Sequence, residues 1–423
     1  WTFRTYDSTG EDSIGIEIWD TYSTFKEDNI LKLHVNVTNY FNRDTTNLTY
    51  RDSLKNKDVY FTRNSNDVYW THDNNTLLFS RTHKGYSNLF SIAVNTPSAE
   101  KQLTKDSRNN VNLTLNPKMD KAIYISGRDE LRLLDLKSFK SDVLVKDEFW
   151  ALYAPQPYFS PDGSHVIYNA YRNFEHDVFT IRLADKKITN LTKTGVTETS
   201  ATWSPDGKYV YFTSNLTKPS YPYGMQQPKI YQMALDKYED PYTIDEFDKL
   251  FKEEEKEPED KDKKKKNDKK ADSDDKKSEV SIKINENGLM ERIKAISPSF
   301  GSQYGPAAYL KDKTNYLFYL SNHDEGKMKL WKTTMEPFEK NKTENVLDEE
   351  VSGYQIETAK DNYYLLAKGA IHTLNIESNK TEKIKIAQTF RRNLSEEFTQ
   401  MFYEAWAGFE ENFYDEDFHG EDW

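Results

Sequence analysis

The side chains best suited to chemistry lie at the end of the chain, where one histidine stands in an acidic stretch. Around His419 lie Asp415, Glu416, Asp417, Glu421 and Asp422. Such a cluster could bind a metal ion or support general base catalysis. However, no second histidine stands at a ligand spacing, and a catalytic histidine needs a nucleophile that the sequence does not nominate. We therefore predict no catalytic, cofactor-binding or metal-binding residue here.

A second candidate pair for catalysis is formed by the neighbours Ser164 and His165. They follow a Ser-Pro-Asp-Gly turn and enter a strand, where adjacent side chains point to opposite faces. The sequence also contains no G-x-S-x-G motif, which excludes the hydrolase module of prolyl-oligopeptidase-type enzymes. We interpret both residues as structural, so the predicted catalytic set of this chain is empty.

The elements that would position these residues are β-hairpins. "YFSPDGSHVIYNAY" (158–171) and "TWSPDGKYVYFTSN" (202–215) each run from a short strand through Ser-Pro-Asp-Gly into an alternating strand. Proline presets the turn and glycine accepts the positive φ that closes it. Weaker copies keep the spacing, and the turn aspartates are Asp28, Asp73, Asp120, Asp162, Asp206, Asp312 and Asp361.

The spacing of these turns predicts the fold class. With one exception they recur at intervals of about 42 to 49 residues, and about 40 to 45 residues is typical of a four-stranded propeller blade. Seven turns therefore predict an all-β propeller of seven four-stranded blades over residues 1–387. A propeller can bind, gate or act as a scaffold, so the fold alone does not give the function.

The exceptional interval, from Asp206 to Asp312, contains a charged insertion. We place it at about 238–285, and its core, 252–279, consists almost entirely of lysine and acidic residues. Such a segment cannot bury enough apolar surface to offset its ordering entropy, so we predict a disordered loop. The alternative, a charged interaction arm, is less favoured because the charges are balanced.

The bulk composition limits the partners. The 423 residues carry a net charge of −12, which argues against nucleic acid. The absence of cysteine excludes disulfides and thiolate metal sites and fits a bacterial cytoplasm or periplasm equally well. No apolar run approaches the roughly 20 residues that span a bilayer. We expect no cofactor, no nucleic acid and no membrane span.

The period of the sequence changes beyond residue 388, where an amphipathic helix is predicted. Spacings of three and four residues place on one face Phe398, Met401, Phe402, Ala405, Trp406, Phe409 and Phe413. An aromatic stripe of this kind must be covered. Its cover is either the underside of the propeller or a domain that follows Trp423, so we assign residues 388–423 to a helical junction.

These terminal residues carry a specific resemblance. "FTQMFYEAWAGFEENFYDEDFHGEDW" (398–423) resembles the segment that joins the last propeller to the catalytic module in the tricorn protease family, with its F-Y-x-x-x-x-H-G-x-D-W signature. The charged insertion before "INENGLMERI" and the Ser-Pro-Asp-Gly blades are also similar to bacterial members. The resemblance covers nearly the whole chain, and the terminal signature is its specific part.

The resemblance implies a serine peptidase that degrades peptides, built from propellers, a helical module, a PDZ domain and an α/β catalytic domain. In that family the histidine of the terminal signature is not catalytic, so His419 inherits no such role, and the serine, its histidine base and the oxyanion donors would lie in a part that this chain lacks. The chain alone would be inactive. It would gate or guide peptides through its channel, and it could form a homo-oligomer. The resemblance favours the periplasm over the cytoplasm.

Two alternatives belong to other classes. The chain could be a stand-alone periplasmic binding propeller that resembles the TolB type. It could also be the propeller of a dipeptidyl-peptidase-like enzyme, which would require a downstream G-x-S-x-G motif. The terminal signature counts against the second alternative.

Overall fold

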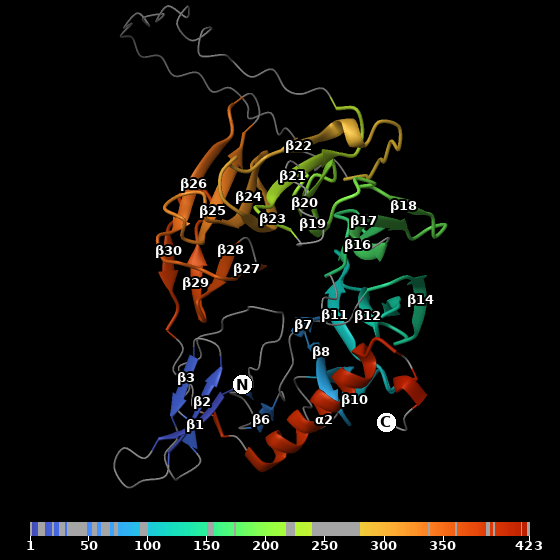
Figure 1. The fold of residues 1–423 in the computed structure, drawn as a ribbon, viewed down its shortest axis with the longest axis vertical. Coiled ribbons are helices and arrows are strands. Elements are labelled where there is room, and N and C mark those ends of the chain that lie inside the picture. Colours follow the sequence, from blue (N-terminus) through green and yellow to red (C-terminus); the bar gives the residue numbers. More distant parts are fainter. Residues whose placement is uncertain are drawn as a thin grey trace, which may run out of the picture.

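A ring of antiparallel sheets dominates the computed structural model (Figure 1). The structure describes residues 2–6, 13–18, 21–24, 30–31, 49–52, 57–60, 68–71, 75–93, 100–149, 156–172, 175–216, 225–238, 280–336, 339–359, 362–385, 390–391, 394–415 and 417–420. Within these residues, six sheets have four strands each, and in every one of them the strands are neighbours in the order in which they follow along the chain. This is the organisation of propeller blades.

The first three of these sheets cover the chain from residue 68 to residue 190. The first contains β7 (Val68–Trp70), β8 (Thr76–His83), β9 (Tyr86–Ala93) and β10 (Lys101–Gln102). The second contains β11 (Asn110–Leu115), β12 (Lys121–Ser126), β13 (Glu130–Asp135) and β14 (Ser141–Lys146). The third contains β15 (Tyr158–Phe159), β16 (His165–Arg172), β17 (Glu175–Arg182) and β18 (Ile188–Asn190).

The other three sheets follow in the same way. The fourth contains β19 (Glu198–Trp203), β20 (Tyr209–Ser214), β21 (Lys229–Ala234) and β22 (Ile293–Ala295), with a 3₁₀ turn at Met290–Arg292. The fifth contains β23 (Gln303–Lys311), β24 (Thr314–Ser321), β25 (Lys329–Met335) and β26 (Lys342–Leu347). The sixth contains β27 (Tyr354–Ala359), β28 (Asn362–Ala367), β29 (Ala370–Leu374) and β30 (Thr381–Lys383).

The prediction of seven four-stranded blades is not supported, because the described residues form six. The N-terminal strands make smaller sheets: β1 (Thr2–Tyr6), β2 (Ser13–Ile18) and β3 (Thr21–Thr24) form one, β5 (Thr49–Asp52) pairs with β6 (Lys57–Tyr60), and β4 (Ile30–Leu31) pairs with β31 (Phe390–Arg391). Counting turns overestimated the blades because a turn identifies a hairpin and not a complete four-stranded sheet.

The predicted turn positions are confirmed where the structure describes them. Asp120, Asp162, Asp206 and Asp312 each lie between the first and second strands of a sheet. In both Ser-Pro-Asp-Gly turns the glycine has positive φ, 69° at Gly163 and 71° at Gly207. The other three predicted turns, at Asp28, Asp73 and Asp361, lie outside the described residues.

The core lies between successive sheets, and the second to fifth sheets bury both faces. On β12, the fully buried Tyr124 packs toward Leu78 of the first sheet, whereas its neighbours Ile123 and Ile125 pack with Val166 of the third. The same alternation recurs on β20 and β24. A strand buried on both faces needs neighbours on both sides, so the sheets stack around a ring.

Residues 280–285, at the end of the predicted insertion, are part of the packed structure. Residues 239–279, which include the segment predicted to be disordered, lie outside the described residues. Beyond them, Ile282 and Ile284 pack against the core between the third and fourth sheets. The Ile282 amide donates to Asp162 Oδ2 at 3.0 Å, and the Asn285 amide donates to the Leu235 carbonyl at 2.8 Å.

The predicted C-terminal helix is present as α2 (Leu394–Asn412), followed by a 3₁₀ turn at Phe418–Gly420. In Figure 1, α2 (red) runs past the first sheet and ends beside the second. None of the helices in the described part of the chain combines the length and the apolar character that crossing a bilayer requires.

Candidate functional site

The site best defined by the structure is the surface on which α2 lies, which we call the helix seat. It begins at the β8–β9 hairpin, where Gly85 has a φ of 88°. A side chain there would place its Cβ 2.9 Å from the Tyr403 carbonyl oxygen and 3.4 Å from the Cβ of Ala407. Ala407 is buried. The helix therefore approaches the hairpin as closely as it does because one residue is glycine and the other is alanine.

Polar contacts hold the last turn of α2. Tyr86 donates from its hydroxyl to Glu410, and the Asn109 backbone amide donates to Glu411 Oε1 at 3.1 Å. The Asn109 side-chain amide donates to the second oxygen of the same carboxylate. Arg128 Nη1 lies 3.5 Å from the Phe413 carbonyl oxygen. The seat thus binds the helix through two adjacent glutamates of α2, Glu410 and Glu411.

The electrostatics of the seat follow from burial. Desolvation raises the pKa of Glu411, although the hydrogen bonds from Asn109 and the charge of Arg108 oppose that shift. Desolvation and the bond to Glu410 raise the pKa of Tyr86 to about 12. A cavity of about 340 Å³ lies beside these contacts, lined by Tyr86, Ser107, Arg108, Gly127, Arg128, Glu410 and Glu411.

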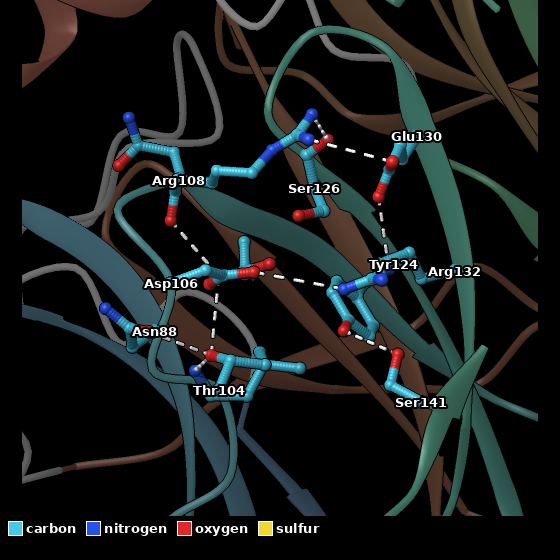
Figure 2. A network of polar contacts seen from close by, with 12 residues as sticks. Asn88, Thr104, Asp106, Arg108, Tyr124, Ser126, Glu130, Arg132 and Ser141 are labelled. Carbon is cyan, nitrogen blue, oxygen red and sulfur yellow. Dashed lines mark hydrogen bonds and ion pairs between the residues drawn. The ribbon is translucent and has the colours of Figure 1, made fainter. Parts of the chain in front are cut away.

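A network of ion pairs around Glu130 holds Arg108, the residue that precedes Asn109 of the seat (Figure 2). Glu130 is 7% exposed, and three cations surround its carboxylate. Arg108 Nη1 lies 3.7 Å from Oε1, Arg132 Nε lies 3.2 Å from Oε2, and Lys146 Nζ lies 3.2 Å from Oε1. Arg108 also donates to the Ser126 carbonyl at 2.9 Å. These contacts, which do not involve the helix, hold the chain next to Asn109 in place.

The same network connects the first two sheets. Asp106 lies 3.9 Å from Arg132 Nη1 and accepts a hydrogen bond from Asn110 at 2.9 Å. Thr104 accepts from the Leu89 amide at 2.9 Å. Residues 103–109 form the connection from β10 to β11, so the seat spans a boundary between two blades.

The aromatic side of α2 lies away from the seat. The exposed fractions are 43% for Phe398, 60% for Phe402, 43% for Trp406 and 46% for Phe409. The sequence predicted this stripe and required a cover, either the propeller or a following domain. The contacts of α2 with the first two sheets come from its other side, through Tyr403, Ala407, Glu410 and Glu411. A contiguous apolar surface of this kind marks an interaction site.

The residues after α2 fold back on its end. The rings of Phe413 and Phe418 stack at 4.7 Å with an interplanar angle of 3°. His419 Nδ1 lies 2.9 Å from Asp415, and its other ring nitrogen contacts the Tyr414 hydroxyl. Glu416, Glu421 and Asp422 of the acidic cluster lie outside the described residues. Elsewhere in the residues that are described, no three His, Asp or Glu side chains gather as metal ligands would.

The structure brings Ser164 and His165 closer than strand alternation predicts, with Ser164 Oγ 2.7 Å from His165 Nδ1. The nearby carboxylate, however, contacts the serine: Asp162 Oδ1 lies 2.7 Å from Ser164 Oγ. In a catalytic triad the acid orients the histidine instead. This arrangement stabilises a turn.

The other Ser-Pro-Asp-Gly turn makes the same contacts without a serine–histidine pair. Ser204 Oγ donates to Asp206 Oδ1 at 2.5 Å, as Ser160 donates to Asp162 at 2.6 Å. The Tyr209 amide donates to Ser204 at 2.8 Å, as the His165 amide donates to Ser160 at 2.9 Å. The geometry at His165 therefore belongs to the repeated turn.

The residues of the seat were not predicted from the sequence. In the sequence Gly85 is indistinguishable from any glycine of a β-hairpin turn, and Asn109 lies in a polar segment with no recognisable motif. The weak signal was Ala407, a small residue among the aromatics of the predicted helix. A small residue on a helix permits close packing, but the sequence does not say against what.

A propeller continued by an amphipathic helix defines the class of this chain. Residues 394–423 match the family model described as "Tricorn protease C1 domain". The structure is similar to the crystal structure of the tricorn protease, with a TM-score of 0.59 and 12% identity, over 98% of this chain and 37% of that chain. These findings confirm the resemblance to the tricorn protease family for the propeller region and the helix after it. This chain spans 37% of that protein's length.

Two further solved structures resemble this one less closely. TolB from Acinetobacter baumannii has a TM-score of 0.40 and 13% identity, over 75% of this chain and 65% of that chain. A puromycin-hydrolyzing peptidase of Mycobacterium tuberculosis has a TM-score of 0.46 and 11% identity, over 90% of this chain and 49% of that chain. Likenesses this weak carry no argument about function. No curated protein matches the sequence.

Proposed function

We propose that this chain is the propeller portion of a tricorn-like serine peptidase and that it gates or guides peptides on their way to or from a catalytic module. The observation that carries the proposal is α2. Its residues match the family model of the tricorn protease C1 domain, and the aromatic side chains on the side opposite the seat are 43% to 60% exposed. Among the described residues no nucleophile and base are arranged as in a catalytic triad, and we expect the chain by itself to be inactive toward peptides.

The two sides of α2 have different roles in this proposal. The seat holds the helix by Glu410, Glu411 and Ala407, which fixes the direction in which the chain leaves the propeller. The aromatic stripe then packs against the rest of the helical module, followed by the PDZ and catalytic domains. Burying one large aromatic side chain contributes roughly 1.5–3 kcal/mol, so the stripe can hold two modules in a fixed relation.

We further propose a periplasmic location in a bacterium, peptides as the ligands of the propeller channel, and possible assembly into a homo-oligomer. These proposals rest on the resemblance to the tricorn protease family. They are separable from the role of α2, which rests on the geometry of the helix.

The test compares this chain with the protein encoded by the whole reading frame that contains it. We expect the 423-residue chain to leave fluorogenic peptides uncut and to remain unlabelled by a serine-reactive probe. The longer protein should cleave them and take up the probe at a serine outside these residues. Cleavage and labelling of the 423-residue chain itself would overturn the proposal.

A substitution in the longer protein tests the stripe. Phe402→Asp places a charge where the next module is proposed to pack, so peptidase activity should fall at least about tenfold. The matched control is Phe300→Asp, because Phe300 is 77% exposed and lies outside α2. Equal activity of the two variants would contradict the proposed packing.

A further inference from the structure

Three boundaries between neighbouring sheets are closed by the same buried polar contacts. After the last strand of a sheet, a hydroxyl accepts a backbone N–H from the third strand of that sheet. These bonds are 2.9 Å long and join Leu89 to Thr104, Val178 to Thr192, and Ile230 to Ser297. Six residues after each hydroxyl stands the first residue of the next sheet, and its side chain is fully buried. These residues are Asn110, Glu198 and Gln303.

The equivalence of these three residues extends to strand register. Each pairs with a fully buried serine at the end of the second strand of its sheet, namely Ser126, Ser214 and Ser321. In each sheet the register then shifts just after this pair, and the residue two positions on has positive φ: 58° at Asn112, 53° at Ser200 and 61° at Gly305. The three sites are therefore one structural position repeated three times.

At two of the three sites the side chain is an amide that donates hydrogen bonds. Asn110 Nδ2 donates to the Ser87 carbonyl at 3.3 Å and to Asp106 at 2.9 Å. Gln303 Nε2 donates to the Phe300 carbonyl at 2.6 Å and to Ser321 Oγ at 3.3 Å, while its Oε1 accepts from Ser297 at 3.0 Å. A neutral amide suits a site that combines donors and acceptors without solvent.

The third site holds a carboxyl group instead. Thr194 donates to Glu198 Oε1, and Ser214 Oγ lies 3.4 Å from the same oxygen. Glu198 Oε2 accepts no hydrogen bond of good geometry from the described residues, although the Thr192 hydroxyl lies close enough to oppose the rise in the pKa of this carboxyl. The charged group that faces Glu198 from the third sheet is another carboxylate, Asp177 of β17, which itself accepts from Asn190 at 2.7 Å. No salt bridge to Glu198 occurs within the described part of the chain.

We propose that Glu198 makes the boundary between the third and fourth sheets sensitive to pH. With a proton, the side chain is neutral like the amides at the two equivalent sites. Without one, it leaves a buried charge that faces Asp177 and that no cation of the described residues neutralises, and the connection at residues 192–198 loosens. This connection is equivalent to residues 104–110, which carry the helix seat, so both lie on the same face of the ring.

The direction of the pKa shift determines whether a rise in pH stabilises or loosens this boundary. Burial, together with the charge of Asp177, raises the pKa of Glu198 to about 7 from the ordinary value of 4.5. The closed boundary therefore binds the proton more tightly than an open one does. The stabilisation by the proton is complete below pH 4.5 and is lost as the pH rises through about 7.

Hydrogen exchange of the 423-residue chain at pH 6 and pH 8 tests the proposal. After correction for intrinsic rates, amides at residues 178 and 192–198 should exchange about tenfold faster at pH 8 than at pH 6. Glu198→Gln should abolish that difference and keep the slow rate at both pH values. Unchanged pH dependence in this variant would overturn the proposal.

A matched substitution tests the equivalence of the sites and does not depend on how Glu198→Gln folds. Gln303→Glu places a carboxyl at the boundary between the fourth and fifth sheets, so exchange at residues 230 and 297–303 should become faster at pH 8. Failure to gain this dependence would contradict the inference. The proposal is also wrong if millimolar Ca²⁺ or Mg²⁺ slows exchange of the wild-type chain at pH 8, because the site would then bind a cation rather than a proton.

Discussion

The sheets and α2 use the same aromatic residues in opposite ways. In the sheets, Tyr124, Phe212 and Phe318 are fully buried between neighbouring blades. On α2, Phe402 is 60% and Trp406 is 43% exposed, although the helix is itself held by a well-defined seat. The difference shows that aromatic content alone does not indicate a core. In this chain the aromatic side chains fill the space between sheets in the propeller, whereas on α2 they provide a contact surface.

The largest expected effect comes from exchanging one aromatic in each region for alanine. Phe318→Ala should lower the free energy of unfolding by about 3–5 kcal/mol, because it leaves a cavity between the fifth and sixth sheets. Phe402→Ala should change it by less than about 0.5 kcal/mol, since the side chain is largely in water. Urea unfolding of the 423-residue chain measures both. If both variants lowered the free energy of unfolding by similar amounts, the proposed difference between the sheets and α2 would be wrong.

A smaller effect is expected at the seat, which separates α2 from the ring. Asn109→Ala removes the side-chain hydrogen bond to the half-buried carboxylate of Glu411, together with the bond that Asn109 Oδ1 accepts from the Ser87 amide at 2.8 Å, and should weaken binding of the helix by about 1–3 kcal/mol. Hydrogen exchange should accelerate in α2 while the sheets stay protected. Gln355→Ala, at an exposed pair with Glu357, is the control. Acceleration throughout the ring would show that helix and sheets unfold as one unit.

The smallest effect concerns pH. Because burial raises the pKa of Glu411, the bound helix favours the protonated carboxyl, and binding weakens as the pH rises from the ordinary glutamate range through the raised value. Glu411→Gln should flatten this dependence in α2 exchange, with a smaller change than Asn109→Ala produces. Glu404→Gln, which alters a side chain paired with Gln400 on the same helix, should retain the dependence. A flat profile in the wild-type chain would contradict the assignment.

Local signals predicted the hairpins and the helix. Proline and glycine at fixed positions determine the Ser-Pro-Asp-Gly turns, and even the weaker copies at Asp120 and Asp312 occur where the spacing placed them. The aromatic period likewise placed Phe398, Phe402, Trp406 and Phe409 on one side of α2. The predicted number of seven four-stranded blades is not supported, because sheet size depends on pairing between strands and a turn indicates only one hairpin.

Long-range contacts explain what the sequence did not reveal. The seat joins Asn109 to Glu411, which lie 302 residues apart, and no local pattern indicates such a pair. The sites of Asn110, Glu198 and Gln303 share a spacing from a hydroxyl residue but not a residue type. Only strand register shows that they are equivalent. A carboxyl in the place of an amide therefore becomes visible only when the three sites are superimposed.

The hydrogen bond between the Asn285 amide and the Leu235 carbonyl, 2.8 Å long, joins two positions next to the fourth sheet that are 50 residues apart in the sequence. The chain leaves the fourth sheet and re-enters it at the same point, and Ile282 and Asp162 secure the returning end. Doubling a flexible connection costs only about 0.6 kcal/mol in closure entropy. A reporter domain inserted between these two positions is therefore expected to leave the blades on either side in place.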